Sequence, residues 1–259
     1  MTEVEVSRVG GVAHVTINRE DARNALSAAV LQALLDAVRE AAADTETRVV
    51  VIASAGERVF CAGADLAVMA DDATGLERHD GRGLLAQLVV AMRECPVPVV
   101  ARVQGICLAG GVGLALACDV VLARRSASFG LPEVDRGLWP FMVSALLARH
   151  MSPKHAMDRM LTGERFDAET AYHYGLVSRV FPDESFDTDV ERYVEKLAGA
   201  PPVAVRLGKA AWVAASETAG LPVALEAMQA QLSLLTTTAD AAEGIAAFFD
   251  KRAPRWTGR

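Results

Sequence analysis

The chain has 259 residues, of which 52% are hydrophobic and 23% charged, a composition that predicts one globular domain with a large core, or one domain with a helical appendage. Its net charge of −7 argues against a nucleic-acid-binding or anionic-membrane-binding protein, because both need an extended basic surface. The most apolar run, residues 106–118, is broken by glycines and is shorter than the ~18 residues of a membrane span.

The N-terminus lacks the charged and apolar regions of a secretory signal, and no two of the four cysteines form a CxxC pair. We therefore expect free thiols and a cytoplasmic location. The histidines at 14, 150, 155 and 173 have no spacing suited to a metal, so no metal site is expected. The sequence contains no GxGxxG, GxxxxGK[ST] or GxSxG motif, which excludes the dinucleotide-binding, P-loop and α/β-hydrolase classes.

The first half of the chain predicts stacked turns of two strands and a helix. Apolar and polar residues alternate on both sides of Gly10-Gly11 and predict an antiparallel hairpin. Helical spacing begins at Ser27, and a short buried helix is expected at 111–118. Further strands are predicted at 49–53, 99–103 and 120–123. No sequence repeat of fixed period accompanies this pattern, so the repetition is structural only.

Helices are predicted to dominate beyond about Phe129. Ser152-Pro153 supplies the N-cap and first-turn proline of a helix, and Asp167 is a suitable N-cap for another. The polar, glycine-containing stretch 71–83 is interpreted as a flap beside the ligand. After Pro182 the apolar spacing predicts helices at 183–198, 203–215 and 221–235.

This change of pattern divides the chain into a core, residues 1–181, and a helical C-terminal region, residues 182–259. The helices of the second region are alanine-rich and amphipathic. Such helices either cap a core or build an oligomer interface, and from the pattern alone we favour the cap.

Three stretches carry residues suited to chemistry. Small residues follow a strand at 60–66 (FCAGADL), and an acidic residue there stands at the expected start of a helix. A second small-residue turn, at 107–114, leads into the buried helix. Backbone N–H groups at such turns can bind an oxyanion or a phosphate. The third stretch, 129–133 (FGLPE), places Glu133 in an apolar setting. Taken singly, each motif is weak.

In this order the three stretches closely resemble the crotonase, or enoyl-CoA hydratase/isomerase, superfamily. Matching segments extend over nearly the whole chain and include residues 18–26, 161–166 and 243–252. The resemblance implies an α/β fold, a crotonase-like spiral of ββα turns followed by a C-terminal helical oligomerisation region. It also implies a homotrimer or dimer of trimers that acts on an acyl-CoA thioester in lipid metabolism, with coenzyme A as part of the substrate and no separate cofactor.

The resemblance assigns an oxyanion hole to the backbone N–H groups of Ala64 and Gly110, which would hold the thioester oxygen as it becomes enolate-like. Arg23 is a candidate for the 3′-phosphate of CoA, and Phe248 and Lys251 match positions through which a neighbouring subunit contacts CoA. Arg23 and Lys251 have solvated surface charge as their alternative. The positions implied in CoA and substrate binding are Ala22, Arg23, Leu26, Ala62, Asp65, Leu66, Gly113, Trp139, Phe248 and Lys251.

Hydratases of this superfamily use two glutamates to activate one water, at the positions of Gly113 and Glu133, and only Glu133 is present here. One carboxylate whose pKa is raised by an apolar pocket suffices to move a proton from C2 to C4 of a 3-enoyl thioester, which is Δ3,Δ2-enoyl-CoA isomerisation. The second acid of dienoyl-CoA isomerases would fall on Phe141, so that chemistry is not expected.

Four alternatives remain open from the sequence. Glu133 can be a structural carboxylate paired with Arg136. With Glu133 alone, the chain can hydrate 2-enoyl thioesters slowly. It can be a non-catalytic acyl-CoA-binding protein, or it can run another enolate reaction such as decarboxylation or thioester hydrolysis.

Overall fold

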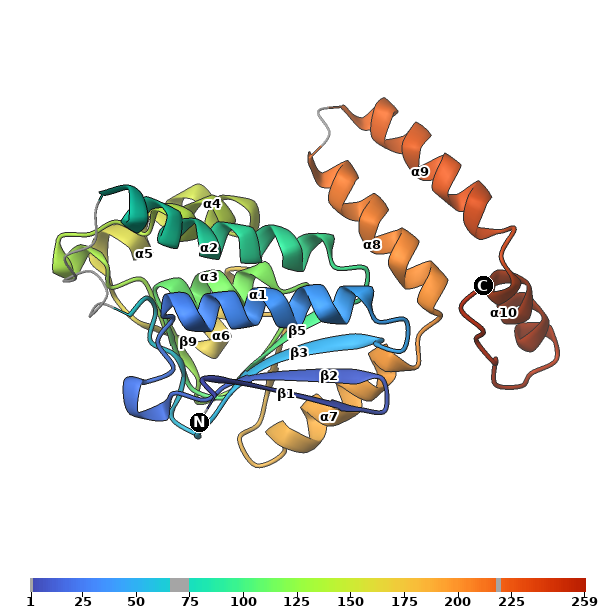
Figure 1. Ribbon diagram of the computed structural model, residues 1–259. Coiled ribbons are helices and arrows are strands. Elements are labelled where there is room, and N and C mark those ends of the chain that lie inside the picture. Colours follow the sequence, from blue (N-terminus) through green and yellow to red (C-terminus); the bar gives the residue numbers. More distant parts are fainter. Residues whose placement is uncertain (1, 66–74, 218–219) are drawn as a thin grey trace.

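The computed structural model of the chain describes residues 2–65, 75–217 and 220–259 and contains two β-sheets with flanking helices (Figure 1). The strands of the larger sheet are Val4–Val9 (β1), Val12–Ile17 (β2), Val49–Ser54 (β3), Val99–Val103 (β5), Val120–Arg124 (β7) and Arg179–Phe181 (β10). The smaller sheet consists of Val59–Cys61 (β4), Ile106–Leu108 (β6), Ser128–Gly130 (β8) and Phe166–Asp167 (β9). Their spatial orders are β1-β2-β3-β5-β7-β10 and β4-β6-β8-β9.

The chain winds through these sheets in turns of two strands and a helix, as the sequence predicted. The successive helices are α1 (Ala28–Ala43), α2 (Gly75–Glu94), α3 (Gly110–Ala117) and α4 (Phe141–His150). After the β1–β2 hairpin, the first strand of each turn joins the larger sheet and the second joins the smaller one. Residues 75–83, interpreted from the sequence as part of a flap, form the first turns of α2.

Local sequence signals explain several of these boundaries. Gly10 and Gly11 have φ angles of 57° and 80°, which close the tight hairpin between β1 and β2. The Ser27 hydroxyl accepts a hydrogen bond from the Val30 N–H and caps α1. Asp167 caps the helix α6 (Ala168–His173) in the same way, as predicted.

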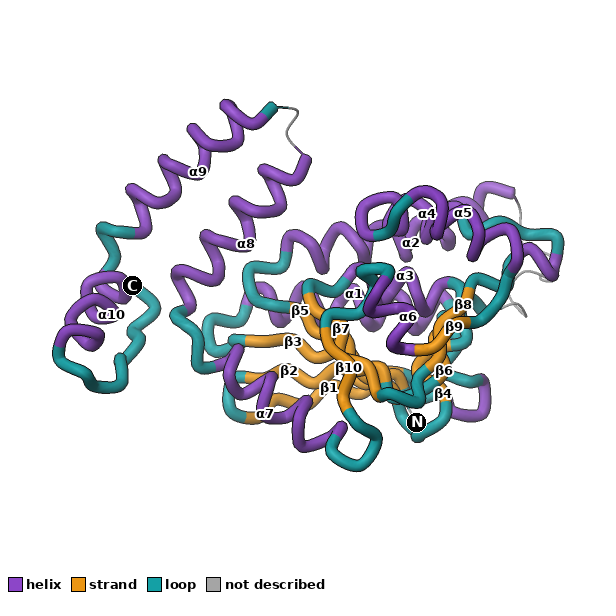
Figure 2. The backbone as a smooth tube through the Cα atoms, turned by 180° about the vertical axis from the view of Figure 1, so that it is seen from behind, coloured by secondary structure: helices purple, strands orange, loops and turns teal. Residues whose placement is uncertain are grey.

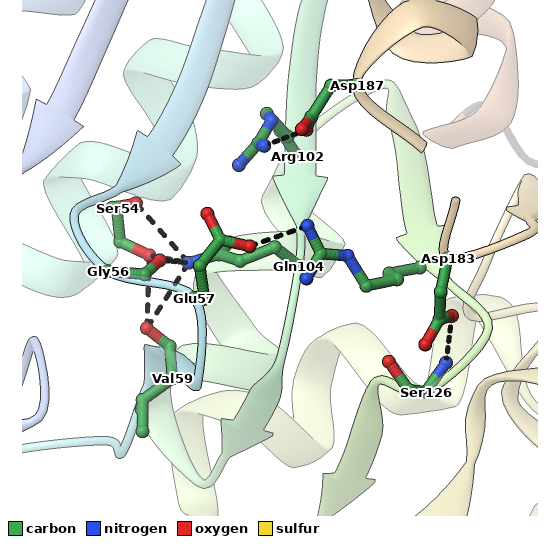
Figure 3. Close-up of polar contacts among 10 residues, drawn as sticks. Ser54, Gly56, Glu57, Val59, Arg102, Gln104, Ser126, Asp183 and Asp187 are labelled. Carbon is green, nitrogen blue, oxygen red and sulfur yellow. Dashed lines mark hydrogen bonds and ion pairs between the residues drawn. The ribbon is translucent and has the colours of Figure 1, made fainter. Parts of the chain in front are cut away.

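A polar network ties together the loops that carry the chain from the larger to the smaller sheet (Figure 3). The side-chain amide of Gln104, between β5 and β6, donates to the Gly56 carbonyl and the Ser54 hydroxyl at 2.9 and 3.0 Å. Arg124, at the end of β7, forms an ion pair with Glu57 at 2.7 Å. Because these loops set where β4 and β6 begin, the network fixes the smaller sheet relative to the larger one.

Beyond β10 the helices separate into two groups. The helix α7 (Phe186–Ala198) lies on one face of the larger sheet, where Phe186, Val190 and Val194 are buried against Val51 and Leu122 (Figure 2). In contrast, α8 (Pro202–Glu217), α9 (Leu221–Leu235) and α10 (Ala239–Phe249) extend away from the sheets (Figures 1 and 2). We call these three helices the arm.

The favoured sequence interpretation, that the C-terminal helices cap the core, therefore holds for α7 and fails for most of the arm. In α8, Val203 is the one residue that is buried among those described, and Lys209 binds Asp119 at 2.6 Å, whereas α9 has no buried residue in the described chain. The division at residues 181 and 182 stays a prediction. None of the described helices has the length and apolar composition that crossing a bilayer requires.

Candidate active site

The three stretches singled out in the sequence meet at one edge of the smaller sheet. β4, β6 and β8 are neighbouring parallel strands, with Cys61 opposite Cys107 and Leu108 opposite Gly130. Because parallel strands end on the same side, the segments that follow them lie next to one another, and in open sheets this edge is where ligands bind. These segments are residues 62–65, 109–110 and 131–133.

The backbone N–H groups of Ala64 and Gly110 are neighbours at this edge. A methyl group placed on Gly110 would lie 3.5 Å from the Ala64 nitrogen, and one placed on Gly63 would lie 3.3 Å from the Gly110 nitrogen. Neither N–H has an acceptor among the described residues. Two adjacent free donors, one of them at the start of α3, are an arrangement that can stabilise an oxyanion.

Ala109 sets the direction of the second donor. Its φ of 52° and ψ of −124° lie where residues with a side chain are rarely found, and this conformation starts α3 directly after β6. The Ala109 N–H donates to the Gly130 carbonyl at 2.9 Å, so that the strained residue is tied to β8. Strain held in this way is typical of functional sites.

The two turns also pack directly against each other. A methyl group on Gly111 would lie 2.6 Å from the Cys61 carbonyl oxygen, and one on Gly63 would lie 2.7 Å from the Ala109 methyl carbon. The Gly63 N–H also donates to the Cys61 sulfur at 3.4 Å. The glycines at 63 and 111 are therefore needed for the close approach of the two donors.

Glu133 begins a short 3₁₀ turn, Val134–Arg136, directly after β8. Its Oε2 atom is buried and has no hydrogen-bond partner among the described residues. Burial raises the pKa of the Glu133 carboxyl above its ordinary value, against the smaller opposing effects of its own backbone N–H and of the charge on Arg136. A half-buried carboxyl group with an unpartnered oxygen is suited to take up a proton from a ligand.

The alternative in which Arg136 neutralises Glu133 is not what the structure contains. The Arg136 guanidinium donates to the Pro132 carbonyl at 2.9 Å, and the buried Oε2 atom of Glu133 has no partner among the described residues. Glu133 therefore keeps a raised pKa although a cation stands three residues away.

Gly113 lies in the buried interior of α3 and faces α4. A methyl group at this position would lie 3.1 Å from the Cγ2 atom of Val143, a residue that is only 4% exposed. The missing second carboxylate is therefore not replaced by a water-filled space, because Val143 packs against the Gly113 backbone.

The first group of predicted CoA positions runs alongside the Ala62–Asp65 turn. Ala62 donates its N–H to the Arg23 carbonyl at 3.1 Å, and Leu26 forms a parallel β-bridge with Ala64. Arg23 is exposed, with a φ of 54°, and follows the 3₁₀ helix η1 (Glu20–Ala22). Leu26 is buried, and its Cδ1 atom lies 3.6 Å from a methyl placed on Gly110, so that it underlies the oxyanion donors.

The other predicted positions are dispersed. Trp139 is partly buried against the core, and Leu66 lies outside the described residues. Phe248, at the end of α10, is 78% exposed, and Lys251 follows it; both lie at the far end of the arm from the smaller sheet (Figure 1). Within one chain these two residues do not reach the strand ends.

Two features near the strand ends were missed from the sequence. Arg19 pairs with Asp65 at 3.0 Å, although nothing in its sequence pattern assigned it a role. Asn24 is fully buried, and its side-chain amide donates to the Ala55 and Val59 carbonyls at 3.0 and 2.9 Å. Both residues stand within segment 18–26, in which the resemblance assigned CoA contacts to Ala22, Arg23 and Leu26 but no role to Arg19 or Asn24.

Two other kinds of site come into question, a metal site and a surface groove. Within residues 2–65, 75–217 and 220–259, no three His, Cys, Asp or Glu side chains gather as metal ligands would. A groove of about 670 Å³ lies between α1 and α2, and its lining includes Arg39, Gln87 and Glu94 but none of the predicted site residues.

Comparison with known proteins agrees with this geometry. Residues 7–259 match the family model described as enoyl-CoA hydratase/isomerase. The chain is 38% identical to the 2,3-dehydroadipyl-CoA hydratase of Escherichia coli K12, with 100% of both chains covered. It is 32% identical to the mitochondrial enoyl-CoA hydratase domain-containing protein 3 of Rattus norvegicus, covering 95% of this chain and 82% of that one. The crystal structure of an enoyl-CoA hydratase from Mycobacterium smegmatis superposes with a TM-score of 0.94 at 34% identity, over 98% of each chain.

Proposed function

Because the chain belongs to the enoyl-CoA hydratase/isomerase family and is an enzyme of that group, we propose that it shifts the double bond of a 3-enoyl-CoA thioester, with Glu133 as its single acid and base. The observation that carries this proposal is the Glu133 carboxyl, whose pKa is raised by burial, at the sheet edge that also presents the free N–H groups of Ala64 and Gly110. In the proposed complex the thioester carbonyl lies at those donors and its C2 atom faces Glu133, which follows β8 at the same sheet edge.

The proposed reaction needs one proton and no water. The Glu133 carboxylate takes a proton from C2, and the electron pair of the C–H bond moves into a dienolate whose negative charge lies on the thioester oxygen. The N–H groups of Ala64 and Gly110 stabilise that oxygen, each by about 2.7 to 4 kcal/mol in comparable sites. Protonated Glu133 then donates its proton to C4, and the double bond moves from C3=C4 to C2=C3.

Position 113 supports isomerisation over hydration. Hydration across C2=C3 requires a water that is held and deprotonated while another proton is delivered, a task that the resemblance gives to two glutamates. Here α3 has glycine at position 113 and no acidic residue along its length, so it supplies no second carboxylate. Hydration by Glu133 alone is the second candidate function, since the relatives in E. coli and M. smegmatis are named as hydratases.

The deciding variant is Glu133→Gln, which keeps the shape of the side chain and removes the proton carrier. We expect kcat/KM for a 3-enoyl-CoA to fall by about 10²- to 10⁴-fold, the usual contribution of a general acid/base. Asp135→Asn, a change at an exposed carboxylate in the same 3₁₀ turn, is the matched control and should leave turnover within about twofold. Unchanged turnover in Glu133→Gln would refute the assignment. Binding of acyl-CoA by the wild type without turnover of either 2-enoyl- or 3-enoyl-CoA would favour a non-catalytic binding protein.

The raised pKa of Glu133 also predicts the pH dependence. The carboxylate form starts the reaction, so kcat/KM should fall as the pH drops through the pKa of Glu133 in the free enzyme. Because burial raises that pKa, we expect this acid limb at a higher pH than the ordinary glutamate value of about 4.3. A profile that stays flat down to pH 4 would contradict the assignment.

The assembly and the remaining CoA contacts belong to the same proposal. We expect a homotrimer or a dimer of trimers in which Phe248 and Lys251 of one chain contact the CoA bound to its neighbour. Their position at the end of the arm, away from the strand ends of their own chain, is consistent with this arrangement. Arg23 is proposed to bind the 3′-phosphate, since its exposed guanidinium follows a turn beside Ala62.

A further inference from the structure

We propose that Arg19 is a positioning residue for the oxyanion hole, because it ties together the two backbone segments that hold the Ala64 N–H in place. This inference rests on the proposed function, in which Ala64 and Gly110 bind the thioester oxygen. Arg19 itself touches neither the ligand nor Glu133 in this account. Its effect is transmitted through Asp65 and Ala25.

Arg19 stands between β2 and η1 and uses each of its three guanidinium nitrogens for a different partner. Nε pairs with Glu3 at 2.7 Å, Nη2 pairs with Asp65 at 3.0 Å, and Nη1 donates to the Ala25 carbonyl at 2.8 Å. The side chains of Arg19 and Asp65 are only 18% and 17% exposed. Ion pairs shielded to this degree are screened less by salt than surface pairs and hold a fixed geometry.

Two of these partners flank the oxyanion donor. Leu26 and Ala64 form an isolated parallel β-bridge, in which Leu26 donates its N–H to the Gly63 carbonyl at 2.8 Å and Asp65 donates its N–H to the Leu26 carbonyl at 3.1 Å. Arg19 binds Ala25 on one side of this bridge and Asp65 on the other.

The bridge consists of a single pair of residues, so the position of Ala64 depends on the contacts that flank the bridge. Two backbone hydrogen bonds form the bridge itself, and a third, from the Ala62 N–H to the Arg23 carbonyl at 3.1 Å, joins the same two segments further along. A displacement of the reacting groups by about 1 Å can cost about 100-fold in rate. Arg19 thus acts as a clamp that limits the movement of the Ala64 N–H.

Arginine suits this position better than lysine. Three partners lie around one planar group, which presents donors in fixed directions, whereas an ammonium is a compact point charge on a flexible chain. Arg19→Lys should therefore keep the positive charge and lose the clamp. Arg19→Met should lose both.

Polarisation of the thioester carbonyl is the readout that a merely structural role would not change. An arylacryloyl-CoA has a conjugated carbonyl whose absorption shifts to longer wavelength when hydrogen bonds draw electron density onto its oxygen. We expect wild-type protein to produce this red shift on binding. In Arg19→Met and Arg19→Lys, the shift of the bound probe should fall to less than about half of the wild-type value.

Kinetics on a 3-enoyl-CoA supply the second readout. We expect kcat to fall by about 10- to 100-fold in Arg19→Met while KM changes by less than about threefold, since a misdirected donor weakens the transition state more than the ground state. Asp65→Asn, which leaves the Glu3 and Ala25 contacts intact, should reduce both kcat and the red shift in the same direction. The double variant should be no worse than the more affected single variant, because both changes break one link.

Arg8→Met is the matched control. Arg8 lies on β1 and also loses two carboxylate contacts on substitution, to Glu40 and Asp44 at 3.4 and 3.8 Å, but it has no link to the bridge. It should retain the wild-type red shift and kcat.

The results of these measurements distinguish a failure of the proposed role of Arg19 from a failure of the proposed oxyanion hole. A red shift in the wild type that persists undiminished in folded Arg19→Lys and Asp65→Asn would overturn the role of Arg19 and leave the proposed function standing. A wild-type protein that binds the probe without any red shift would overturn the oxyanion hole itself, and the clamp with it. Equal losses in Arg8→Met would also overturn the clamp, because a general loss of stability would then explain the effect.

Discussion

At the carboxyl ends of β4 and β6 the backbone is packed so closely that Gly63 and Gly111 have no room for a methyl group, whereas large apolar side chains on the arm are exposed. Phe248 and Phe249 are 78% and 74% exposed, and Trp212 on α8 is 70% exposed. The edge of the smaller sheet is therefore completed within one chain. The arm leaves its apolar surface uncovered, which is the pattern of a segment that packs against another subunit.

The largest effect is expected where the packing is tightest, at Gly111→Ala. The added methyl would lie 2.6 Å from the carbonyl oxygen and 2.8 Å from the Cβ atom of Cys61, and neither atom is the far end of a flexible side chain that could move aside. We expect a loss of about 2 to 3 kcal/mol in the free energy of unfolding, together with a clear loss of activity. Urea denaturation measures the first effect. A variant as stable as wild type would show that the two turns are not packed in this way.

The next largest effect concerns Lys209, which joins the arm to the core. Its ammonium donates to Asp119 at 2.6 Å and to the Met92 and Val97 carbonyls at 3.1 Å each. Lys209→Met should lower the free energy of unfolding by about 1.5 to 3 kcal/mol near neutral pH, measured by urea denaturation. The exposed Lys154→Met is the control and should be close to neutral.

The difference in unfolding free energy between wild type and Lys209→Met, called the deficit here, should also depend on pH. Burial raises the pKa of Asp119, and the charge of Lys209 opposes that rise. A group whose pKa is higher in the folded than in the unfolded state loses stability as the pH rises through the folded value. Without Lys209 the pKa of Asp119 rises further, so the deficit should shrink as the pH is lowered and Asp119 is protonated. A difference in unfolding free energy that stays constant from pH 8 down to about pH 4, near the ordinary Asp value, would contradict this role of Asp119.

The smallest effect is expected at Gly208→Ala, the counterpart of Gly111→Ala on the arm. A methyl at Gly208 meets no atom within 4 Å, and glycine within a helix costs about 0.5 to 1 kcal/mol relative to alanine. The variant should therefore be more stable by about that amount. Destabilisation, seen together with a smaller particle in sedimentation, would mean that a neighbouring subunit packs against this face of α8.

The sequence predicted the elements whose pattern is local. The hairpin of β1 and β2, the helix that starts after Ser27 and the buried helix after Gly110 follow from alternation, caps and glycine placement, and the structure confirms them. In contrast, β6 and β8 have three residues each, which is too short for an alternating pattern. Only the family resemblance brought their segments together before the structure did.

Two side-chain contacts between residues far apart in the sequence were not predicted. Val143 packs on Gly113 from a helix thirty positions further along the chain, and Arg19 reaches Asp65 across the first crossover. Both contacts depend on how the helices and strands are placed relative to one another, which a local sequence pattern does not specify. The raised pKa of Glu133 was expected from its apolar neighbours, but the diversion of Arg136 to the Pro132 carbonyl required the structure.

The central claim is that a site with Glu133 and without a second acid moves protons more readily than it adds water. It is tested most directly by measuring kcat/KM of the wild-type protein for 3-enoyl-CoA and 2-enoyl-CoA thioesters of the same chain length, with the products separated as 2-enoyl- and 3-hydroxyacyl-CoA. The account predicts faster isomerisation than hydration. Hydration that is as fast as or faster than isomerisation would contradict it.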